Sequence, residues 1–270
     1  MTQQISDFPL FDTHCHADFE AFEQGFTPEQ SIDGYLKEAK QAQVEKLLIP
    51  SIGKSNWKKV DKIAQSHSNV YYALGFHPYF LDQANDEQFS ELRQLLSSKN
   101  SQCVAIGECG LDFFVDVERE KQECFFIQQM ELAKEFDLPL IIHERKSYNR
   151  LIELIKQYKF TLGGVIHGFS GSEQQALAWI KLGFYIGVGG TITYPRAQKT
   201  RTAIAKLPLE CLVLETDAPD MPMYGNQGNV NHSKHLVTIL NELFLLRKEP
   251  KQSVAAQIWQ NSHRAFGICE

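Results

Sequence analysis

The sequence predicts an α/β fold of the (β/α)8 TIM-barrel type, and two observations support this prediction. Short apolar runs alternate with helical patterns along all 270 residues, and eight such units in a chain of this size are typical of one barrel. Polar side chains of the kind that bind metals follow several of these runs directly. We therefore expect a single barrel domain over residues 1–270. A doubly wound open sheet is the alternative, but it would separate the first unit from the last unless the strand order brought them together.

Eight short apolar runs are the expected strands of a buried parallel sheet. They cover residues 10–11, 46–50, 70–74, 104–106, 140–142, 164–166, 184–188 and 211–214. Helical patterns cover residues 31–43, 55–66, 87–97, 118–136, 147–158, 172–182, 197–206 and 233–246, and a further helix is expected over residues 253–266.

Local signals indicate where some of these helices begin and end. Ser31, Ser55 and Ser172 stand where a hydroxyl would cap the N-terminus of a helix. Gly183 stands between a helical pattern and the next apolar run, where glycine commonly ends a helix.

The overall charge limits the partners that the protein is expected to bind. The formal net charge is −6, which is unlike the basic face of a protein that grips long stretches of nucleic acid. Bound cations add local positive charge, so a contact with a few phosphates is compatible with an acidic chain. Any contact with nucleic acid is therefore expected to be short and local.

Composition also indicates a compartment. No apolar run approaches about 18 residues, so no membrane-spanning helix is expected. Residues 1–12 lack the basic and apolar regions of a secretory signal. The six cysteines form no C-x-x-C pair and lack the spacing of a small disulfide scaffold. Reduced thiols and a cytoplasmic location are therefore expected.

Side chains able to bind a metal stand where predicted strands end. They are His14, His16, Glu108, His143, His167 and Asp217. Because the carboxyl ends of all strands in a barrel face one mouth, these side chains are expected to converge there. His14 and His16 are two positions apart, which in a strand directs both imidazoles to the same face. The pattern predicts a metal centre at the mouth.

The donor set indicates the kind and number of ions. Imidazole and carboxylate ligands without cysteine suit zinc, manganese or magnesium. Four imidazoles and two carboxylates exceed what one catalytic ion needs, and the two oxygens of Glu108 are able to bridge two ions. Two divalent metal ions (Mg²⁺, Mn²⁺ or Zn²⁺) are therefore the expected cofactors.

Two further acids are expected to support this centre. Asp12 stands just before His14, where its carboxylate would orient a ligand imidazole. Asp112 follows Glu108 by four positions and is expected either to form a local turn or to support a ligand.

Two other residues are expected to bind the substrate. His77 follows the third predicted strand and therefore points to the mouth. Arg145 lies two positions after His143, and its planar guanidinium suits phosphate, although a salt bridge to a loop acid is an equal alternative. The backbone N–H groups of residues 169–171 are a further candidate for anion binding.

Eight segments together resemble the TatD family of metal-dependent deoxyribonucleases, within the amidohydrolase-like barrels. In chain order they are FDTHCHAD, GFHPY, IGECGLDFF, LPLIIHERK, VIHGFSGS, GVGGTITYP, ETDAPDMP and QNSHRAFG. The resemblance covers nearly the whole chain and implies a distorted TIM barrel with a divalent metal centre. All six residues named above match the family's ligand positions one by one. It also implies phosphodiester hydrolysis of the 3′-exonuclease or DNA-repair type.

The stretch around and after the ETD motif departs from the family pattern. Val230 stands where a basic residue is common, and Ser233 stands where proline is common. Asp220 and Met221 stand where a turn with leucine is frequent. These positions are expected on the substrate side of the mouth, and the six ligand positions are intact.

The two expected ions divide the ligands between them. Glu108 would bridge both ions, whereas the other ligands fall into two sets: His14, His16 and Asp217 for one ion, and His143 and His167 for the other.

The resulting hypothesis is hydrolysis of a phosphodiester by a metal-activated water. Asp217 and Glu108 would be the catalytic residues, with Asp217 accepting the proton of the water. His77 and Arg145 would hold the phosphate oxygens. DNA ends or short single-stranded nucleic acid would be the substrate, and no membrane or obligate protein partner is expected.

Two other functions fit the same pattern. A barrel hydrolase acting on a C–N, lactone or ester bond of a small molecule would use the same activated water on a carbonyl. A binding protein with a structural metal site would need fewer converging strands. Salt distinguishes a nuclease from a small-molecule hydrolase, because rising salt weakens phosphate binding steeply.

Overall fold

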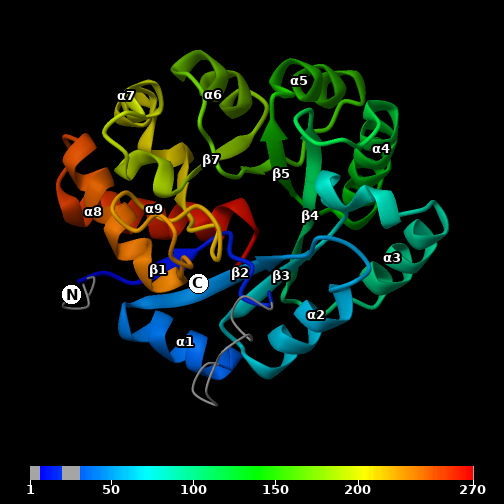
Figure 1. Ribbon diagram of the computed structural model, residues 1–270, viewed down its shortest axis with the longest axis horizontal. Coiled ribbons are helices and arrows are strands. Elements are labelled where there is room, and N and C mark those ends of the chain that lie inside the picture. The colour runs from blue at the N-terminus through cyan, green and yellow to red at the C-terminus, as the bar shows by residue number, and fades with distance from the viewer. Residues whose placement is uncertain (1–6, 20–30, 270) are drawn as a thin grey trace.

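Eight parallel strands form one sheet in the protein, and helices cover its outside (Figure 1). The computed structural model describes residues 7–19 and 31–269. The strands pair in chain order, each with the next along the chain. This arrangement confirms the predicted (β/α)8 barrel. Residues 1–6, which belong to the segment expected to lack a signal sequence, lie outside the described residues.

The strands and helices alternate along the chain. The strands are β1 (Leu10–Asp12), β2 (Val44–Pro50), β3 (Val70–Leu74), β4 (Cys103–Asp112), β5 (Leu140–Arg145), β6 (Gly164–Ile166), β7 (Phe184–Val188) and β8 (Leu212–Leu214). The α-helices are α1 (Ile32–Gln41), α2 (Trp57–Ser66), α3 (Glu87–Ser97), α4 (Arg119–Phe136), α5 (Tyr148–Gln157), α6 (Glu173–Ile180), α7 (Gln198–Lys206), α8 (Leu236–Leu246) and α9 (Lys251–Ala265). Short 3-10 helices are η3 (Pro78–Gln83), η4 (Gly190–Thr193), η5 (Leu209–Cys211) and η6 (Ser233–His235).

Most of the predicted helix boundaries are confirmed within a few residues. The hydroxyl of Ser31 accepts a hydrogen bond from the first turn of α1 at 3.4 Å. Ser172 caps α6 in a reciprocal arrangement with Gln175. Gly183 adopts a φ of 88° directly before β7, which is the left-handed conformation that glycine favours after a helix.

The predicted cap at Ser55 is wrong, because α2 begins later than the pattern indicates. The helix starts at Trp57, and Asn56 is the residue before it. The side chain of Asn56 accepts a hydrogen bond from the amide of Ile52, 3.0 Å away, and so stabilises the turn after β2 instead of the helix.

β4 is longer than its apolar pattern predicts, and this changes the place of Glu108. The predicted strand covers residues 104–106, whereas β4 continues to Asp112. After an irregularity in register, its pairing with β5 resumes at Cys109. Glu108 therefore lies within a strand and not in the loop after it. The pattern missed this extension because glycine and polar residues interrupt the apolar run.

The barrel closes where β1 meets β8, and the contacts continue into the loops beyond these strands. Each of the two strands spans only three residues. The amide of Thr13 donates to the carbonyl oxygen of Leu214 at 3.0 Å, and the amide of Asp217 donates to that of His14 at 2.9 Å. This seam therefore brings His14 and Asp217 side by side, although they are far apart in the sequence.

The opposite end of the barrel is closed by the C-terminal segment. Phe266 packs with side chains of the barrel interior, among them Phe11, Leu48 and Ile141. A cavity of about 780 Å³ lies at this end, lined by residues 264–269 and by Cys103 at the start of β4. None of the predicted site residues lines this cavity.

No helix among the described residues has the length and apolar character needed to cross a membrane. All six cysteines lie in the described ranges, and their thiols are free.

Candidate metal centre

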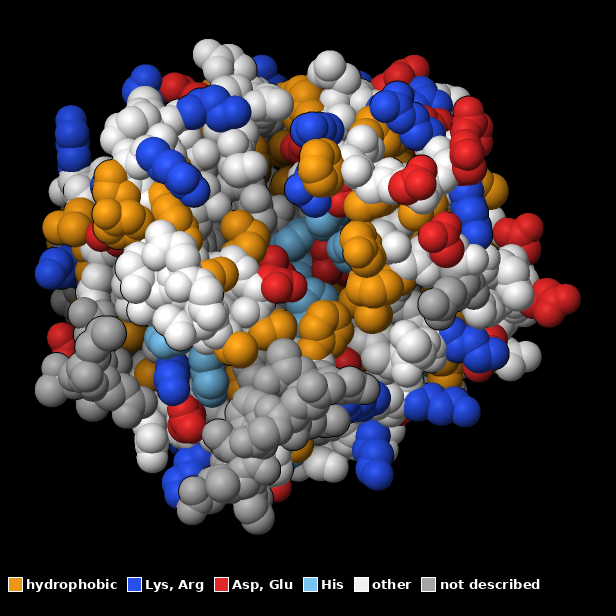
Figure 2. Space-filling model, in the orientation of Figure 1, with side chains coloured by type: hydrophobic (Ala, Val, Ile, Leu, Met, Phe, Trp, Pro, Cys, Tyr) orange, Lys and Arg blue, Asp and Glu red, His pale blue; other side chains and the backbone are white. Residues whose placement is uncertain are grey.

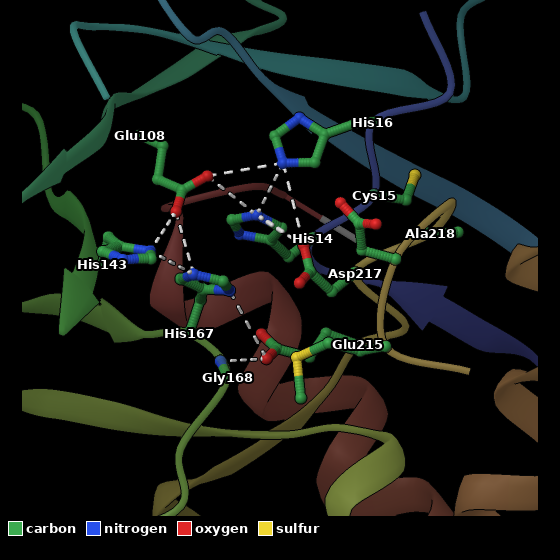
Figure 3. Close-up of polar contacts among 12 residues, drawn as sticks. His14, Cys15, His16, Glu108, His143, His167, Gly168, Glu215, Asp217 and Ala218 are labelled. Carbon is green, nitrogen blue, oxygen red and sulfur yellow. Dashed lines mark hydrogen bonds and ion pairs between the residues drawn. The ribbon is translucent and has the colours of Figure 1, made fainter. Parts of the chain in front are cut away.

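The side chains predicted as ligands converge at the carboxyl ends of the strands, around the carboxylate of Glu108 (Figure 3). Glu108 is 1% exposed, and its two oxygens face different imidazoles. Oε2 lies 3.2 Å from His14 Nε2 and 3.4 Å from His16 Nε2. Oε1 lies 2.8 Å from His167 Nε2 and 3.1 Å from His143 Nδ1. The carboxylate thus stands between two groups of donors, and histidine and acidic side chains form the floor of a hollow on this face (Figure 2).

Glycines let β4 approach β5 closely at this point. A Cβ on Gly110, whose φ is 135°, would lie 2.1 Å from the backbone oxygen of His143. A Cβ on Gly107 would lie 2.8 Å from the Cβ of Ile141. A side chain at either position would push β4 away from β5, and Glu108 away from His143.

Asp217 lies on the open side of the centre. Its φ of 57° is left-handed, which is uncommon for a residue with a side chain and is often found at functional sites. Its Oδ1 lies 3.5 Å from His14 Nε2 and 3.7 Å from His16 Nε2. The side chain is 15% exposed, against 1% for Glu108, so Asp217 is the carboxylate that faces the mouth.

The spacing of the donor atoms fits bound cations. Ligand atoms about 2.1 Å from one ion lie roughly 3.0–3.4 Å apart in octahedral or tetrahedral geometry. His14 Nε2 and His16 Nε2 are 3.4 Å apart, and His143 Nδ1 and His167 Nε2 are 3.3 Å apart. Glu108 Oε2 is buried and has no hydrogen bond of good geometry among the described residues, despite its short distance to His14. Divalent cations would satisfy these converging lone pairs.

Neighbouring polar groups give His143 and His77 different tautomers. His143 Nε2 lies 3.1 Å from Asp112 Oδ2, and this acceptor places the ring proton on Nε2. The other nitrogen, Nδ1, then has a lone pair that faces Glu108. His77 is equally close, with its Nε2 3.1 Å from Glu108 Oε1. Its Nδ1, however, accepts a hydrogen bond from the amide of Tyr79 at 3.1 Å, which places the ring proton on Nε2. His143 therefore presents a lone pair to the centre, whereas His77 presents a donor.

Asp112 makes contacts of both expected kinds, the first being with the imidazole of His143. Asp112 is 2% exposed, and its Oδ1 accepts a hydrogen bond from the amide of Phe114 at 2.9 Å, which fixes the turn after β4.

Charges within the centre shift the pKa values of its groups in opposite directions. Burial alone would raise the pKa of Glu108, but His167, His77 and His14 hold it well below its usual value. Burial would lower the pKa of His167, but Glu108, with smaller contributions from Asp217 and Glu215, raises this pKa to about 10. Burial lowers the pKa of His77 to about 4, so this ring is neutral at pH 7. Without a cation, Glu108 and His167 thus form a buried ion pair.

Asp12 contacts backbone and hydroxyl groups, which corrects the expectation that it orients a ligand imidazole. Its Oδ1 accepts a hydrogen bond from the amide of Thr216 at 2.9 Å. Its Oδ2 accepts hydrogen bonds from the hydroxyls of Thr216 and Ser233, each at 2.6 Å. Because Asp12 is the last residue of β1, its side chain crosses the seam towards the segment that carries Asp217.

The two departures from the family pattern at Val230 and Ser233 lie in different surroundings. Val230 is 53% exposed. Ser233 is fully buried, and its hydroxyl donates a hydrogen bond to Asp12. It therefore does not lie on the substrate side as expected. Its hydroxyl also lies 2.7 Å from that of Tyr35 on α1.

Glu215 is a buried acid at the centre that the pattern of strand ends did not identify. Its Oε1 accepts a hydrogen bond from the amide of Gly168 and lies 3.9 Å from His167 Nδ1 (Figure 3). Burial raises its pKa to about 8. Glu215 therefore supports the loop and the ring of His167. The available signal was an acid directly after the apolar run of β8. The sequence prediction assigned this motif to Asp217, two positions later, and so did not select Glu215.

Arg145 lies beside the centre, with contacts to two neighbours. Its guanidinium carbon is 4.0 Å from the centre of the Phe114 ring, and its Nη1 is 3.9 Å from Asp112 Oδ2. The side chain is 51% exposed, so the contact with Asp112, at the end of β4, leaves much of the guanidinium open to solvent.

The candidate anion site at residues 169–171 lines a small cavity of about 120 Å³ next to His167. Lys199 and Glu144 line the same cavity, so it contains charges of both signs.

Comparisons with known proteins agree on one family. The family described as TatD related DNase matches residues 11–267 of the chain. YjjV of Escherichia coli (strain K12), an uncharacterized metal-dependent hydrolase, is 42% identical over 260 residues, which cover 96% of this chain and 98% of that protein. An uncharacterized metal-dependent hydrolase of Haemophilus influenzae is 40% identical over 263 residues, which cover 95% and 99%.

One solved structure supports the same relationship, and a more distant one shares the fold. The crystal structure of YjjV, a TatD homolog, matches with a TM-score of 0.90 at 41% identity, covering 96% of this chain and 98% of that one. The phosphotriesterase homology protein of Escherichia coli, solved with phosphate in its active site, shares the fold with a TM-score of 0.68 at 15% identity, covering 97% and 100%.

Proposed function

This chain belongs to the TatD family of metal-dependent hydrolases, and from that premise we propose that it is a deoxyribonuclease acting on DNA ends. The main support for the proposal is the position of Glu108, because its two buried oxygens face two separate sets of donors. This geometry suits two divalent cations, Mg²⁺, Mn²⁺ or Zn²⁺. When bound, such cations would activate a water and neutralise charge on both the attacking and the leaving oxygen of a phosphodiester.

The six ligands divide between two positions that share Glu108. We assign His14, His16 and Asp217 to one position, and His143 and His167 to the other. The donor atoms of His14, His16 and Glu108 all lie within 4.8 Å of one another, as do those of His77, Glu108 and His143. His77 does not join the second set of ligands, because its facing nitrogen carries the ring proton.

Asp217 is the residue that we assign to accept the proton of the attacking water. It faces the mouth, where the substrate arrives, and it is the more exposed of the two carboxylates. Glu108 is buried between the imidazoles, so we assign it the role of a ligand.

Two donors would hold the nonbridging phosphate oxygens. His77 presents a neutral N–H beside Glu108, and Arg145 presents a permanently charged guanidinium at the edge of the mouth. These donors would bind the substrate and orient the phosphorus, while the ligands hold the cations.

The test uses the metal-free protein reconstituted separately with Mg²⁺, Mn²⁺ and Zn²⁺. Each form is incubated with end-labelled single-stranded DNA, and the products are separated by length. Stepwise shortening with at least one metal supports the proposal, and activity should fall steeply as salt rises. Intact DNA with all three metals, together with hydrolysis of a lactone, ester or amide that is insensitive to salt, would favour the small-molecule alternative.

A further inference from the structure

Exposed aromatic side chains gather at the mouth of the barrel. Among the described residues, the aromatic rings with large exposure are Tyr79 (57%), Phe80 (43%), Phe114 (58%) and Tyr224 (61%). All four follow the carboxyl end of a strand, namely β3, β4 or β8. Single exposed aromatics are common, but a set confined to the face of the metal centre indicates a binding surface. Hydrophobic side chains surround the hollow above the centre (Figure 2).

Two of these rings are connected directly to the centre. The ring centroids of Phe80 and His77 are 5.6 Å apart, and those of Phe80 and Tyr79 are 5.0 Å apart in an edge-on arrangement. The amide of Tyr79 donates to His77 Nδ1. Pro78, the first residue of η3, restricts the backbone before the pair. The backbone that carries the two rings is therefore fixed beside His77, the donor that faces Glu108.

Phe114 has a different role, because the basic side chains of Arg145 and Lys146 already lie over its ring. The guanidinium carbon of Arg145 is 4.0 Å from the ring centre, and Lys146 Nζ is 4.5 Å from it. Lys146 has a left-handed φ of 55°, a conformation that costs free energy and is often found at binding sites. The ring thus orders two long basic side chains before any ligand binds, which lowers the entropy cost of binding a phosphate.

The aromatic pair and the basic pair lie on one part of the rim. β3 pairs with β4, and β4 pairs with β5, so the loops after these strands are neighbours. No lysine or arginine of the described residues lies over the rings of Tyr79 and Phe80, in contrast to Phe114. Tyr79 is 57% and Phe80 43% exposed, so part of each ring is accessible to a flat ligand.

We propose that Tyr79 and Phe80 form a stacking site for the unpaired nucleobase next to the cleaved phosphate, and that Arg145 and Lys146, ordered by Phe114, bind the adjoining phosphate. The proposal rests on the proposed nuclease function. Aromatic faces alternating with cations bind single strands with little sequence preference, because every base has a flat face. A base held in a duplex cannot stack on the pair, so the site selects unpaired ends. A site that contacts only one base and one phosphate needs few basic residues, which is compatible with the net charge of −6.

Fluorescence of 2-aminopurine tests the stacking directly. The metal-loaded protein is titrated with oligonucleotides that carry 2-aminopurine at one or the other end, next to a phosphorothioate linkage that resists cleavage. Stacking on the rings is expected to quench the fluorescence of one end. The double variant Tyr79→Ala/Phe80→Ala should lose the quenching, and its Kd should rise about 5- to 100-fold. Leu245→Ala, on α8 and 76% exposed, is the matched control and should bind like the wild type.

A second measurement needs no variant and so does not depend on folding. Wild-type KM is compared for single strands with a natural end and with an abasic end, and the abasic end should have a KM about 5- to 100-fold higher. Cleavage with equal KM for both ends and no quenching would overturn the stacking site and leave the nuclease function intact. Quenching without cleavage would support the site and contradict the nuclease function. Absence of both would overturn both proposals.

Discussion

The carboxylate of Asp12 accepts the backbone N–H of Thr216, 2.9 Å away across the seam of the barrel and 204 positions away in the sequence. Asp12 precedes His14 by two residues, and Thr216 directly precedes Asp217. The same carboxylate also lies 3.4 Å from the amide of His14. One buried carboxylate therefore contacts both the segment of His14 and the segment of Asp217, which come from the two ends of the chain.

Asp12→Asn should weaken the centre without changing any ligand. The amide nitrogen that replaces Oδ2 would face two hydroxyls that donate to it, so the segments of His14 and Asp217 would move apart. We expect metal affinity to fall about 10- to 100-fold, in the range of other changes next to ligands. The free energy of unfolding should fall by about 1–3 kcal/mol, because buried donors lose their acceptor.

Metal titration and urea unfolding measure these two effects. Asp33→Asn is the control, because Asp33 is an exposed acid in the first turn of α1. The control should change the stability by less than about 0.5 kcal/mol. Normal metal affinity in Asp12→Asn would show that the seam does not position the ligands.

Glu108→Gln should remove the bridge between the two proposed ions. The amide nitrogen is not a metal ligand, so we expect the protein to retain one tightly bound ion in place of two. The rate of DNA cleavage should fall about 10³-fold or more, because one cation no longer stabilises the transition state. Elemental analysis of the dialysed protein and single-turnover kinetics measure both quantities. Glu135→Gln, on the exposed side of α4, is the control. Two bound ions and normal kinetics in Glu108→Gln would refute the bridging role.

Substitution of two neighbouring histidines should separate ligand from substrate donor. His143→Ala removes a lone pair, so the protein should lose one ion. His77→Ala removes an N–H donor, so both ions should remain while KM for DNA rises about 10- to 100-fold, as expected for a hydrogen bond to a charged group. Metal content is the decisive measurement. Loss of an ion from His77→Ala would mean that the hydrogen bond from Tyr79 does not set the tautomer of His77.

Metal binding should release protons at pH 7. Glu108 raises the pKa of His167 to about 10 in the metal-free centre, and the pKa values of His16 and His143 are also raised despite burial. A cation binds only the neutral ring, so protons and metal compete. Because these folded-state pKa values are raised, the competition is strong at low pH and weakens as pH rises towards 10. Metal affinity should therefore be higher at pH 8 than at pH 6.

Calorimetry in two buffers with different ionisation enthalpies measures the number of protons released. The heat of metal binding at pH 7 should differ between the buffers. Equal heats would mean that the imidazoles are already neutral in the metal-free protein.

Local patterns in the sequence predicted the barrel and six of the residues that gather at its mouth, but not Glu215. Apolar runs of strand length predicted the units, and parallel strands in a barrel share one mouth, so the residues that follow them meet there. His14, His143 and His167 could be identified in this way without knowledge of any contact. The need for glycine at positions 107 and 110 became clear only from the close approach of β4 to β5.

Other features depend on contacts between distant segments. The extension of β4 past Glu108 follows from pairing with β5, which overrides the interrupted apolar pattern. The different roles of His77 and His143 follow from the hydrogen-bond partner of the second ring nitrogen, which is a backbone amide in one case and Asp112 in the other.

The sequence alone thus determined the type of fold and the donors at its mouth, because strand periodicity is a local property and barrel geometry is shared by all strands. Only the tertiary structure decided how the donors are used. It turned the two oxygens of Glu108 to different sides, set the tautomer of each imidazole, and paired Asp12 with Thr216. These outcomes depend on the packing of segments that are distant in the chain, and no local pattern encodes such packing.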